Sequence, residues 1–311
     1  MPDIVISEFM DQAPVDAAAK QYSVHYDPDL VDKPGELKTL LADARALVVR
    51  NRTRVTQELL DAAPRLRVVG RLGVGLDNID LAACKARNVQ VCPATGANDA
   101  SVAEWVIITA MMLLRGAFLS KQECLSGAWP RSACMGRESG AKIMGLVGFG
   151  AIARATAERA RCLGMAVMAY DPYVGPDDPA WENARRADDL SHLLETADIV
   201  SLHVPLTDET RHLIDADALA RMKADAVLIN AARGGVVDEA AVVAALQEGR
   251  LGGCALDVFE TEPLTREAAA RFQGVPNLVM TPHIGGVTVE SNQRVSQVTM
   301  DNVRRVLEES V

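Results

Sequence analysis

The chain has 311 residues, of which 49% are hydrophobic and 24% are charged, and its net charge is −10. This length and composition are ordinary for a globular protein of two domains, and the acidic balance excludes binding of nucleic acid through a basic face. The chain begins without a basic segment and its longest apolar run, residues 105–114, is too short to cross a bilayer, so we expect no membrane segment and a cytoplasmic protein.

Short apolar runs alternate with amphipathic segments along the whole chain. In the first part, apolar runs predict strands at residues 4–7, 23–26, 46–49, 67–69 and 89–91, and a helix is predicted at residues 58–63. A second series predicts strands at residues 143–147, 166–170, 199–203, 226–230, 253–258 and 278–281, with helices at 152–163, 190–197 and 239–247. Runs that are apolar throughout are typical of parallel sheets covered by helices on both faces. The chain is therefore predicted to form two doubly wound α/β domains.

Two helical segments set the predicted domain boundaries. Ser101 and Glu104 fit a capping box before an apolar run, so we expect a helix that begins near Asp99 and leads into the second domain. Residues 288–309 are also helical in pattern and are predicted to return to the first domain. The predicted domains are residues 1–98 with 288–311, and residues 99–287.

A glycine-rich segment, G-L-V-G-F-G-A-I-A at residues 145–153, follows a predicted strand and opens a predicted helix. Gly148 suits a tight turn, Gly150 lets the backbone approach a pyrophosphate, and Ala153 suits close packing of helix on strand. Asp171, at the end of the next strand, can bind the ribose hydroxyls of NAD and repel the 2′-phosphate of NADP. No arginine is adjacent to Asp171, which favours NAD. The alternative is that Asp171 only caps a turn or a helix.

Three further segments lie at the carboxyl ends of later predicted strands, where open α/β sheets bind ligands. They are N-A-A-R-G-G with Arg233, A-L-D-V-F-E-T-E-P-L with Glu262, and T-P-H-I-G-G with His283. Each residue alone has an ordinary structural explanation: a surface ion pair, a loop acid, a histidine in a turn. Together they suit oxidation of an alcohol, because a histidine can take the hydroxyl proton, a glutamate can orient the imidazole, and an arginine can bind a carboxylate. Small neighbours, including Gly234 and Gly235, are predicted to leave room for a nicotinamide.

With these segments the sequence resembles the D-isomer-specific 2-hydroxyacid dehydrogenases, and within them the phosphoglycerate-dehydrogenase-like branch. The resemblance runs from Asp3 to Val311 and rests on ordered motifs, which are V-V-G-R-L-G-V-G-L-D-N-I-D, G-L-V-G-F-G-A-I-A, H-V-P-L-T-D-E-T-R, N-A-A-R-G-G-V-V-D-E, A-L-D-V-F-E-T-E-P and P-H-I-G-G. It implies catalysis by Arg233, Glu262 and His283, an active site in the cleft between two Rossmann-like domains, and a homodimer built mainly on the coenzyme domain.

The resemblance also implies which residues bind the cofactor and the substrate, a small 2-hydroxy or 2-oxo acid. Residues 99–287 are expected to form the NAD-binding domain, and the other domain is expected to bind the substrate. The residues assigned to NAD are Gly148, Gly150, Ala151, Ile152, Asp171, Val204, Ala231, Ala232, Asp257, Gly285 and Gly286. Asp257 corresponds to the family's acid near the nicotinamide amide.

The expected substrate residues point to a distal anionic group on the 2-hydroxy acid. In R-L-G-V-G, residues 71–75, the backbone of the loop ending at Gly75 is expected to bind the carboxylate, and Val74 replaces a common threonine. The family's positions for a distal phosphate fall on Arg50 and Arg71, and Arg131 is expected to reach the site from the partner subunit. The segment around Asn98 departs from the phosphoglycerate pattern, so a sulfonate, as in sulfolactate, is an alternative to phosphate. A simple 2-hydroxy acid, with these arginines on the surface, remains a further alternative.

Other functions remain open alternatives. A non-enzymatic NAD-sensing corepressor shares this fold and these residues, whereas a formate dehydrogenase of the same superfamily has glutamine where Glu262 stands. The chain ends soon after the last predicted helix, so we expect no regulatory domain for an amino acid effector. The six cysteines form no Cys-x-x-Cys pair and the five histidines are not closely paired, so we expect reduced thiols and no metal site.

Overall fold

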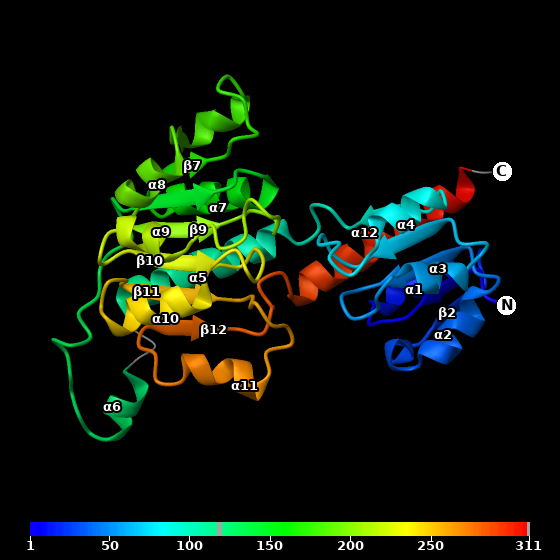
Figure 1. The fold of residues 1–311 in the computed structure, drawn as a ribbon, viewed down its shortest axis with the longest axis horizontal. Coiled ribbons are helices and arrows are strands. Elements are labelled where there is room, and N and C mark those ends of the chain that lie inside the picture. Colours follow the sequence, from blue (N-terminus) through cyan, green and yellow to red (C-terminus); the bar gives the residue numbers. More distant parts are fainter. Residues whose placement is uncertain (117–119, 310–311) are drawn as a thin grey trace. The chain divides into compact units, whose positions relative to one another are not determined.

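The computed structural model describes residues 1–116 and 120–309, and within them the chain forms two compact units (Figure 1). One unit joins Met1–Asn98 to Val287–Val311, and the other is Asp99–Gly286. In the described residues, no helix combines the length and the apolar character that a membrane span requires.

The first unit is a parallel sheet with helices on both faces. Its described residues form a five-stranded sheet in the order β2-β1-β3-β4-β5, and the strands are β1 Ile4–Ile6, β2 Val24–Tyr26, β3 Ala46–Val49, β4 Val68–Arg71 and β5 Gln90–Pro93. Helices α1 (Gln12–Ala18) and α12 (Val289–Glu308) share one hydrophobic core with the sheet. The other face packs with α2 (Pro34–Leu41), α3 (Gln57–Asp61) and α4 (Leu81–Ala86). Because both faces are covered, β1 is buried along its whole length, which explains its continuous apolar run.

Helix α12 packs closely on the sheet of the first unit, although it is the last element of the chain. A Cβ atom added to Gly70, in β4, would lie 2.7 Å from Val303 Cγ2. The glycine therefore allows the helix to approach the strand. Val303 and Met300 are buried in the same core as Ile4 and Ile6. Helix α12 is therefore part of the hydrophobic core of the first unit.

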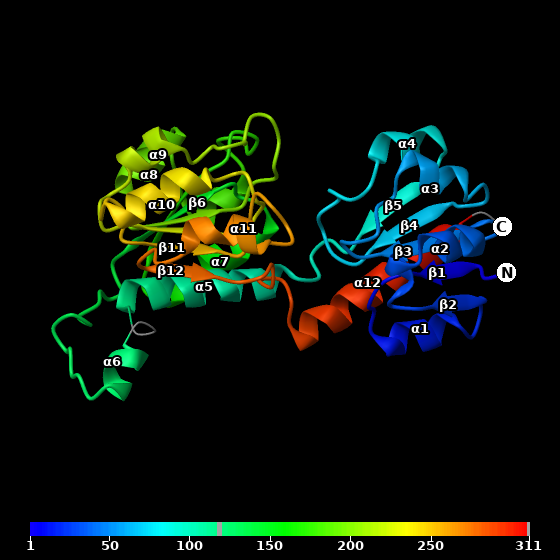
Figure 2. The same cartoon turned by 60° about the horizontal axis from the view of Figure 1, so that its bottom comes forward.

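The second unit has the same design on a larger scale. Its described residues form a seven-stranded parallel sheet in the order β12-β11-β10-β9-β6-β7-β8, and the strands are β6 Ile143–Val147, β7 Ala166–Tyr170, β8 Arg185–Arg186, β9 Ile199–Leu202, β10 Val227–Asn230, β11 Gly253–Leu256 and β12 Leu278–Met280. One face is covered by α5 (Asp99–Arg115) and α7 (Ala151–Cys162). The other is covered by α8 (Leu190–Thr196), α9 (Ala216–Arg221) and α10 (Glu239–Gln247), as Figure 2 shows. The predicted fold class, two α/β units with parallel sheets, is confirmed.

Shorter elements complete the two units. Three-ten turns η1 (Leu30–Asp32), η3 (Pro179–Asn183) and η4 (Ala270–Phe272) and helix α11 (Arg266–Ala269) lie in connections. Helix α6 (Lys121–Leu125) stands away from the sheet of the second unit (Figure 1).

The predicted capping box at Ser101 is wrong in detail. Helix α5 begins at Asp99, so Ser101 lies inside its first turn rather than at the capping position. A capping box occurs instead at the start of α12, where Ser291 N donates to Thr288 Oγ1 at 3.0 Å and Thr288 N donates to Ser291 Oγ at 2.9 Å. The sequence pattern predicted the start of α5 correctly but assigned it the wrong cap.

Candidate active site

The glycine-rich loop after β6 is shaped by close contact with the loop after β9. Gly148 has φ of +87°, and a Cβ added there would lie 2.6 Å from the carbonyl oxygen of His203 and 3.0 Å from Val204 Cγ1. Only glycine suits both the positive φ and the close approach. This contact places the half-buried Val204 beside the start of α7.

Gly150 differs from Gly148, because the protein itself does not require a glycine there. It is the N-cap of α7 with φ of −75°, and among the described residues no atom lies within 4 Å of an added Cβ. Ala153, in the first turn of the helix, is fully buried, whereas Ala151 is exposed and Ile152 is half-buried. The open space lies at a helix N-terminus, whose free N–H groups attract a phosphate. The loop therefore fits the pyrophosphate of a dinucleotide.

Asp171 accepts hydrogen bonds from two backbone groups beside this loop. Phe149 N donates to its Oδ2 at 2.8 Å, and Tyr173 N donates to its Oδ1 at 2.9 Å. The carboxylate thus caps a turn, as the structural alternative expected. It also ties the end of β7 to the glycine-rich loop.

Arg233 lies in a tight turn directly after β10. Asn230, which is 1% exposed, donates from Nδ2 to the Arg233 carbonyl at 2.9 Å and accepts from Ala232 N at 3.0 Å. The Arg233 guanidinium donates from Nη1 to the carbonyl of Ala232 at 2.6 Å. A buried asparagine thus fixes the backbone that carries the arginine, with the half-buried Ala231 and Ala232 beside it.

Gly234 packs directly against the loop after β11. A Cβ atom there would lie 1.7 Å from the Phe259 carbonyl oxygen and 3.0 Å from Glu260 N. The loop after β11, which packs against this position, therefore requires a glycine here, and the expected room for a nicotinamide stays a prediction. Gly235 adopts φ of +78° and allows the chain to turn.

Glu262 and His283 form a direct pair on the loops after β11 and β12. His283 Nδ1 lies 2.7 Å from Glu262 Oε2, and Phe259 N donates to Glu262 Oε1 at 2.9 Å. The exposed fractions of the two side chains are 47% for His283 and 34% for Glu262, so both are accessible to a ligand. Burial alone would raise the pKa of Glu262, but the His283 hydrogen bond, the Phe259 N–H and the charge of Arg233 outweigh it and lower that pKa.

Asp257 holds the segment that carries His283. This carboxylate is 1% exposed and accepts from Thr281 Oγ1 at 2.5 Å, Ile284 N at 2.8 Å and Gly285 N at 2.7 Å. His283 N donates to the Asp257 carbonyl at 2.8 Å, and His283 itself has φ of +55°. Its uncommon backbone conformation is thus imposed by the bonds to Asp257. A Cβ on Gly285 would come within 2.9 Å of Asp257 Oδ2, which explains the glycine before Gly286.

The residues predicted to bind the substrate are divided between the two units. Arg50, Arg71, Val74, Gly75 and Asn98 lie in the first unit, whereas the exposed Arg131 and the Arg233, Glu262 and His283 set lie in the second.

Arg50 and Arg71 are held in different ways. Arg50 donates from Nη2 to Asn292 Oδ1 at 2.8 Å, and burial lowers the pKa of its guanidinium. Arg71 donates from Nη1 to the Leu72 carbonyl at 2.9 Å and lies under Gly73, where an added Cβ would meet it at 1.7 Å. Asn98 Oδ1 is buried without a hydrogen-bond partner among the described residues, and Val74 is 37% exposed.

Sequence reasoning missed Glu8, a carboxylate that organises the Arg50 loop. Glu8 is 4% exposed and accepts from the backbone N of Arg50 at 2.8 Å, Arg52 at 3.0 Å and Thr53 at 2.9 Å. Burial alone would raise its pKa, but these backbone hydrogen bonds lower it below the ordinary value. The available signal was an acidic residue two positions after the end of the buried strand β1.

Comparison with known proteins places this chain among dehydrogenases. The model of the "D-isomer specific 2-hydroxyacid dehydrogenase, NAD binding domain" matches residues 107–285. The chain is 57% identical over 307 residues to the (S)-sulfolactate dehydrogenase of Chromohalobacter salexigens, a match that covers 99% of each protein. It is 38% identical over 309 residues to the D-3-phosphoglycerate dehydrogenase of Mycobacterium leprae, covering 99% of this chain but 57% of that protein.

A solved structure supports the same relationship. The D-lactate dehydrogenase of Aquifex aeolicus, complexed with NAD and lactic acid, superimposes with a TM-score of 0.85 at 27% sequence identity. The superposition covers 98% of this chain and 96% of that one.

Proposed function

The chain belongs to the D-isomer-specific 2-hydroxyacid dehydrogenase family, and we propose that Arg233, Glu262 and His283 are its catalytic residues. The reaction class is NAD-dependent interconversion of a 2-hydroxy acid and a 2-oxo acid. The observation that carries the assignment is the 2.7 Å contact between His283 Nδ1 and Glu262 Oε2, with the charge of Arg233 acting on the same carboxylate. This arrangement joins a proton acceptor, its orienting acid and a cation on one edge of the sheet.

Oxidation of the alcohol removes a hydride from carbon and a proton from oxygen, and bound NAD supplies the hydride acceptor. Because Nδ1 of His283 faces Glu262, the Nε2 atom is the one that takes the hydroxyl proton. The Glu262 carboxylate then stabilises the imidazolium. Arg233 binds the substrate carboxylate and polarises the 2-oxygen. In the reverse direction, the same Nε2 returns the proton to the oxygen.

Residues of the second unit are proposed to bind NAD along the carboxyl edge of its sheet. Gly148, Gly150 and the start of α7 accommodate the pyrophosphate, because the space at Gly150 is open. The Asp171 carboxylate binds the ribose hydroxyls. The small or apolar residues proposed to line the cofactor are Ala151, Ile152, Val204, Ala231, Ala232, Gly285 and Gly286, and Asp257 lies beside them.

The substrate is proposed to be a 2-hydroxy acid with a distal anion, bound by Arg50 and Arg71, with Val74, Gly75 and Asn98 nearby. A sulfonate is favoured, since the protein that shares 57% identity over nearly the whole chain is an (S)-sulfolactate dehydrogenase. The guanidinium groups suit an anionic oxygen cluster, because each offers several donors in a fixed plane. Phosphate and an uncharged distal group are the alternatives.

A substrate panel tests this proposal. NADH formation should be followed with both enantiomers of sulfolactate, with 3-phosphoglycerate, malate, glycerate and lactate. We expect the highest kcat/KM with one enantiomer of sulfolactate. A higher value with lactate or glycerate would assign the enzyme to simple 2-hydroxy acids, and NAD binding without turnover of any compound would favour a cofactor-sensing protein.

The protein is further proposed to act as a homodimer in the cytoplasm. Leu125, Trp129 and Met135 are 71%, 77% and 83% exposed on the segment that contains α6, and Ile108 is 57% exposed on α5. Such apolar side chains on one segment favour burial against a second copy. The described cysteines are free thiols, which the cytoplasm keeps reduced.

A further inference from the structure

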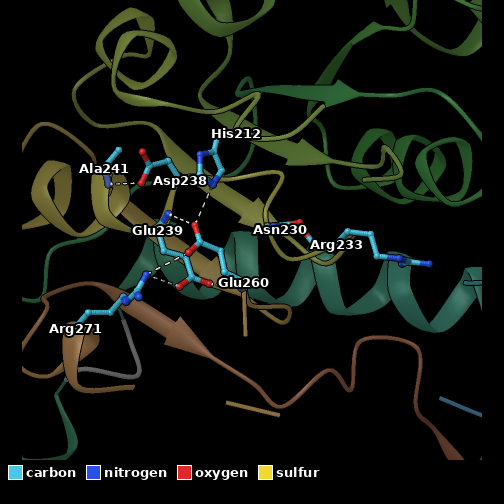
Figure 3. Close-up of polar contacts among 8 residues, drawn as sticks. All are labelled: His212, Asn230, Arg233, Asp238, Glu239, Ala241, Glu260 and Arg271. Carbon is cyan, nitrogen blue, oxygen red and sulfur yellow. Dashed lines mark hydrogen bonds and ion pairs between the residues drawn. The ribbon is translucent and has the colours of Figure 1, made fainter. Parts of the chain in front are cut away.

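A polar cluster lies beside the loops that carry Arg233 and Glu262. We call His212, Glu239, Glu260 and Arg271 the Glu239 cluster (Figure 3). Glu239 begins α10, Glu260 follows β11, Arg271 belongs to η4, and His212 lies between β9 and α9. The cluster therefore joins elements that are distant from one another in the sequence.

Glu239 is the buried centre of this cluster. Glu239 is 4% exposed, and its Oε1 accepts a hydrogen bond from Glu260 N at 2.7 Å. Arg271 Nη1 bridges Glu239 Oε2 at 3.2 Å and Glu260 Oε2 at 3.3 Å. Burial raises the pKa of Glu239, because a buried carboxylate is costly, and these contacts offset part of that cost. They also restrict where Glu260 can lie.

The cluster fixes the loop that carries Glu262 at two successive backbone groups. Glu260 N is bound by Glu239, while the preceding Phe259 N donates to Glu262 itself at 2.9 Å. Glu260 Oε1 also lies 3.2 Å from His212 Nε2 and accepts from Glu239 N at 3.4 Å. The position of Glu262 thus depends on a backbone segment that Glu239 holds at Glu260 N.

The same cluster reaches the loop that carries Arg233. His212 N donates to the Gly235 carbonyl at 2.8 Å, and Gly234 packs against the Phe259 carbonyl, which an added Cβ would meet at 1.7 Å. In Figure 3 the Arg233 side chain points away from Glu239 and Glu260. The cluster therefore contacts the backbone of the loops that carry Arg233 and Glu262.

We propose that Glu239 is a positioning residue for the dehydrogenase reaction: it holds Glu260, and through Glu260 it sets the relative placement of Arg233 and Glu262. This inference rests on the proposed catalytic role of those two residues. Glu239 touches neither substrate nor cofactor in this proposal. It acts by fixing backbone, and small displacements of catalytic groups reduce rates strongly.

The test compares Glu239 variants with a matched buried carboxylate elsewhere in the same unit. Asp198 accepts from Ile143 N at 2.8 Å and from Lys223 Nζ at 3.0 Å, with 15% of its side chain exposed. It lies at the amino ends of β6 and β9, whereas the catalytic loops follow the carboxyl ends of β10 and β11. Glu239→Ala, Glu239→Gln, Asp198→Ala and Asp198→Asn should be assayed with the preferred 2-hydroxy acid. Turnover should be expressed per NADH-binding site, so that an unfolded fraction does not count.

For Glu239→Ala we expect kcat per site to fall by about 10- to 100-fold, the scale of a misplaced catalytic group. Glu239→Gln retains an oxygen that can accept from Glu260 N, so it should recover part of this loss. Both variants should bind NADH with unchanged affinity, and both Asp198 variants should keep wild-type kcat per site. Equal kcat per site for Glu239→Ala and Asp198→Ala would overturn the proposal.

Two further variants keep the outcome decisive. If Glu239→Ala does not bind NADH because it does not fold, Arg271→Met replaces it, since it removes the bridging cation from a side chain that is 42% exposed. A several-fold loss of kcat per site supports positioning, and unchanged kcat contradicts it. Glu262→Gln tests the underlying function: unchanged kcat there would contradict the catalytic assignment itself. Loss at Glu262 without loss at Glu239 would reject only the positioning role.

Discussion

At the residue scale, His283 is expected to exchange the substrate proton. Its Nδ1 is bonded to Glu262 at 2.7 Å, so substitution removes the acceptor atom Nε2 together with its orienting bond. His283→Ala should lower kcat by roughly 10²- to 10⁴-fold, which is the usual contribution of a general acid or base. NADH affinity, measured by fluorescence titration, should hardly change. His192→Ala is the matched control, because His192 is a partly exposed histidine on α8 paired with Asp188. Wild-type turnover in His283→Ala would remove this residue from the mechanism.

The lowered pKa of Glu262 gives a pH dependence whose sign can be stated. Its folded pKa is below the ordinary 4.5, so its ionised form stabilises the folded state above that pH and this stabilisation disappears as pH falls through the folded pKa. Glu262→Gln should therefore lower Tm more at pH 5 than at pH 3. Because 34% of the side chain is exposed, solvent screens the effect and the difference should be small. Thermal unfolding of both proteins at the two pH values measures it. A Tm difference that is larger at pH 3 than at pH 5 would contradict the lowered pKa of Glu262.

Some functional residues could be predicted from the sequence and others could not. Arg233, Glu262 and His283 stand in motifs whose residue types suit the chemistry, so the sequence was enough to propose them. Glu8 and Glu239 were missed because an acid beside a strand or at a helix start usually faces solvent. Each of these two residues is 4% exposed. The loops that bury them are distant in the sequence, so the local sequence pattern does not predict the burial.

At the element scale, the strands were predictable where burial on both faces makes the sequence apolar throughout. Strand β8 was not predicted, because it consists of two exposed arginines, Arg185 and Arg186, paired with Met168 and Ala169 on β7. Its pairing depends on the neighbouring strand rather than on an apolar pattern. The predicted strands at 199–203 and 253–258 also extended too far. Strands β9 and β11 end at residues 202 and 256, so His203, Asp257 and Val258 lie beyond the last paired residues.

The loops after the strands contain glycines that serve different purposes, and this difference is testable. Gly234→Ala should lower Tm and kcat together, because its Cβ would lie 1.7 Å from the Phe259 carbonyl oxygen. Gly150→Ala should leave Tm without cofactor nearly unchanged but raise the NAD dissociation constant, because the described protein leaves that space open within 4 Å. Gly140→Ala, which also meets nothing described within 4 Å, is the control for both measurements. If the NAD affinity of Gly150→Ala is unchanged, the pyrophosphate does not bind beside Gly150.

At the scale of the whole molecule, the alternation of strands and helices was sufficient to predict two α/β units. It could not specify which residues of one subunit act in another, because that depends on an interface between copies. The segment after α5 is the place to examine, since Leu125, Trp129 and Met135 are largely exposed there and Arg131 lies among them. If this segment packs on a second copy, Arg131 can serve the substrate site of the partner.

Mixing two inactive variants tests that exchange. Arg131→Ala removes the proposed anion-binding group, and His283→Ala removes the proton acceptor. If Arg131 acts in the partner, a mixed dimer contains one intact site and one site with both defects, so refolding an equal mixture should recover about a quarter of wild-type activity by random pairing of subunits. If Arg131 acts within its own subunit, each site of the mixed dimer carries one defect and no activity returns. Native mass spectrometry should verify that mixed dimers form, and lactate should serve as the control substrate because it lacks a distal anion. If mixed dimers are verified but turnover of sulfolactate is not recovered, Arg131 acts within its own subunit or has only a surface role.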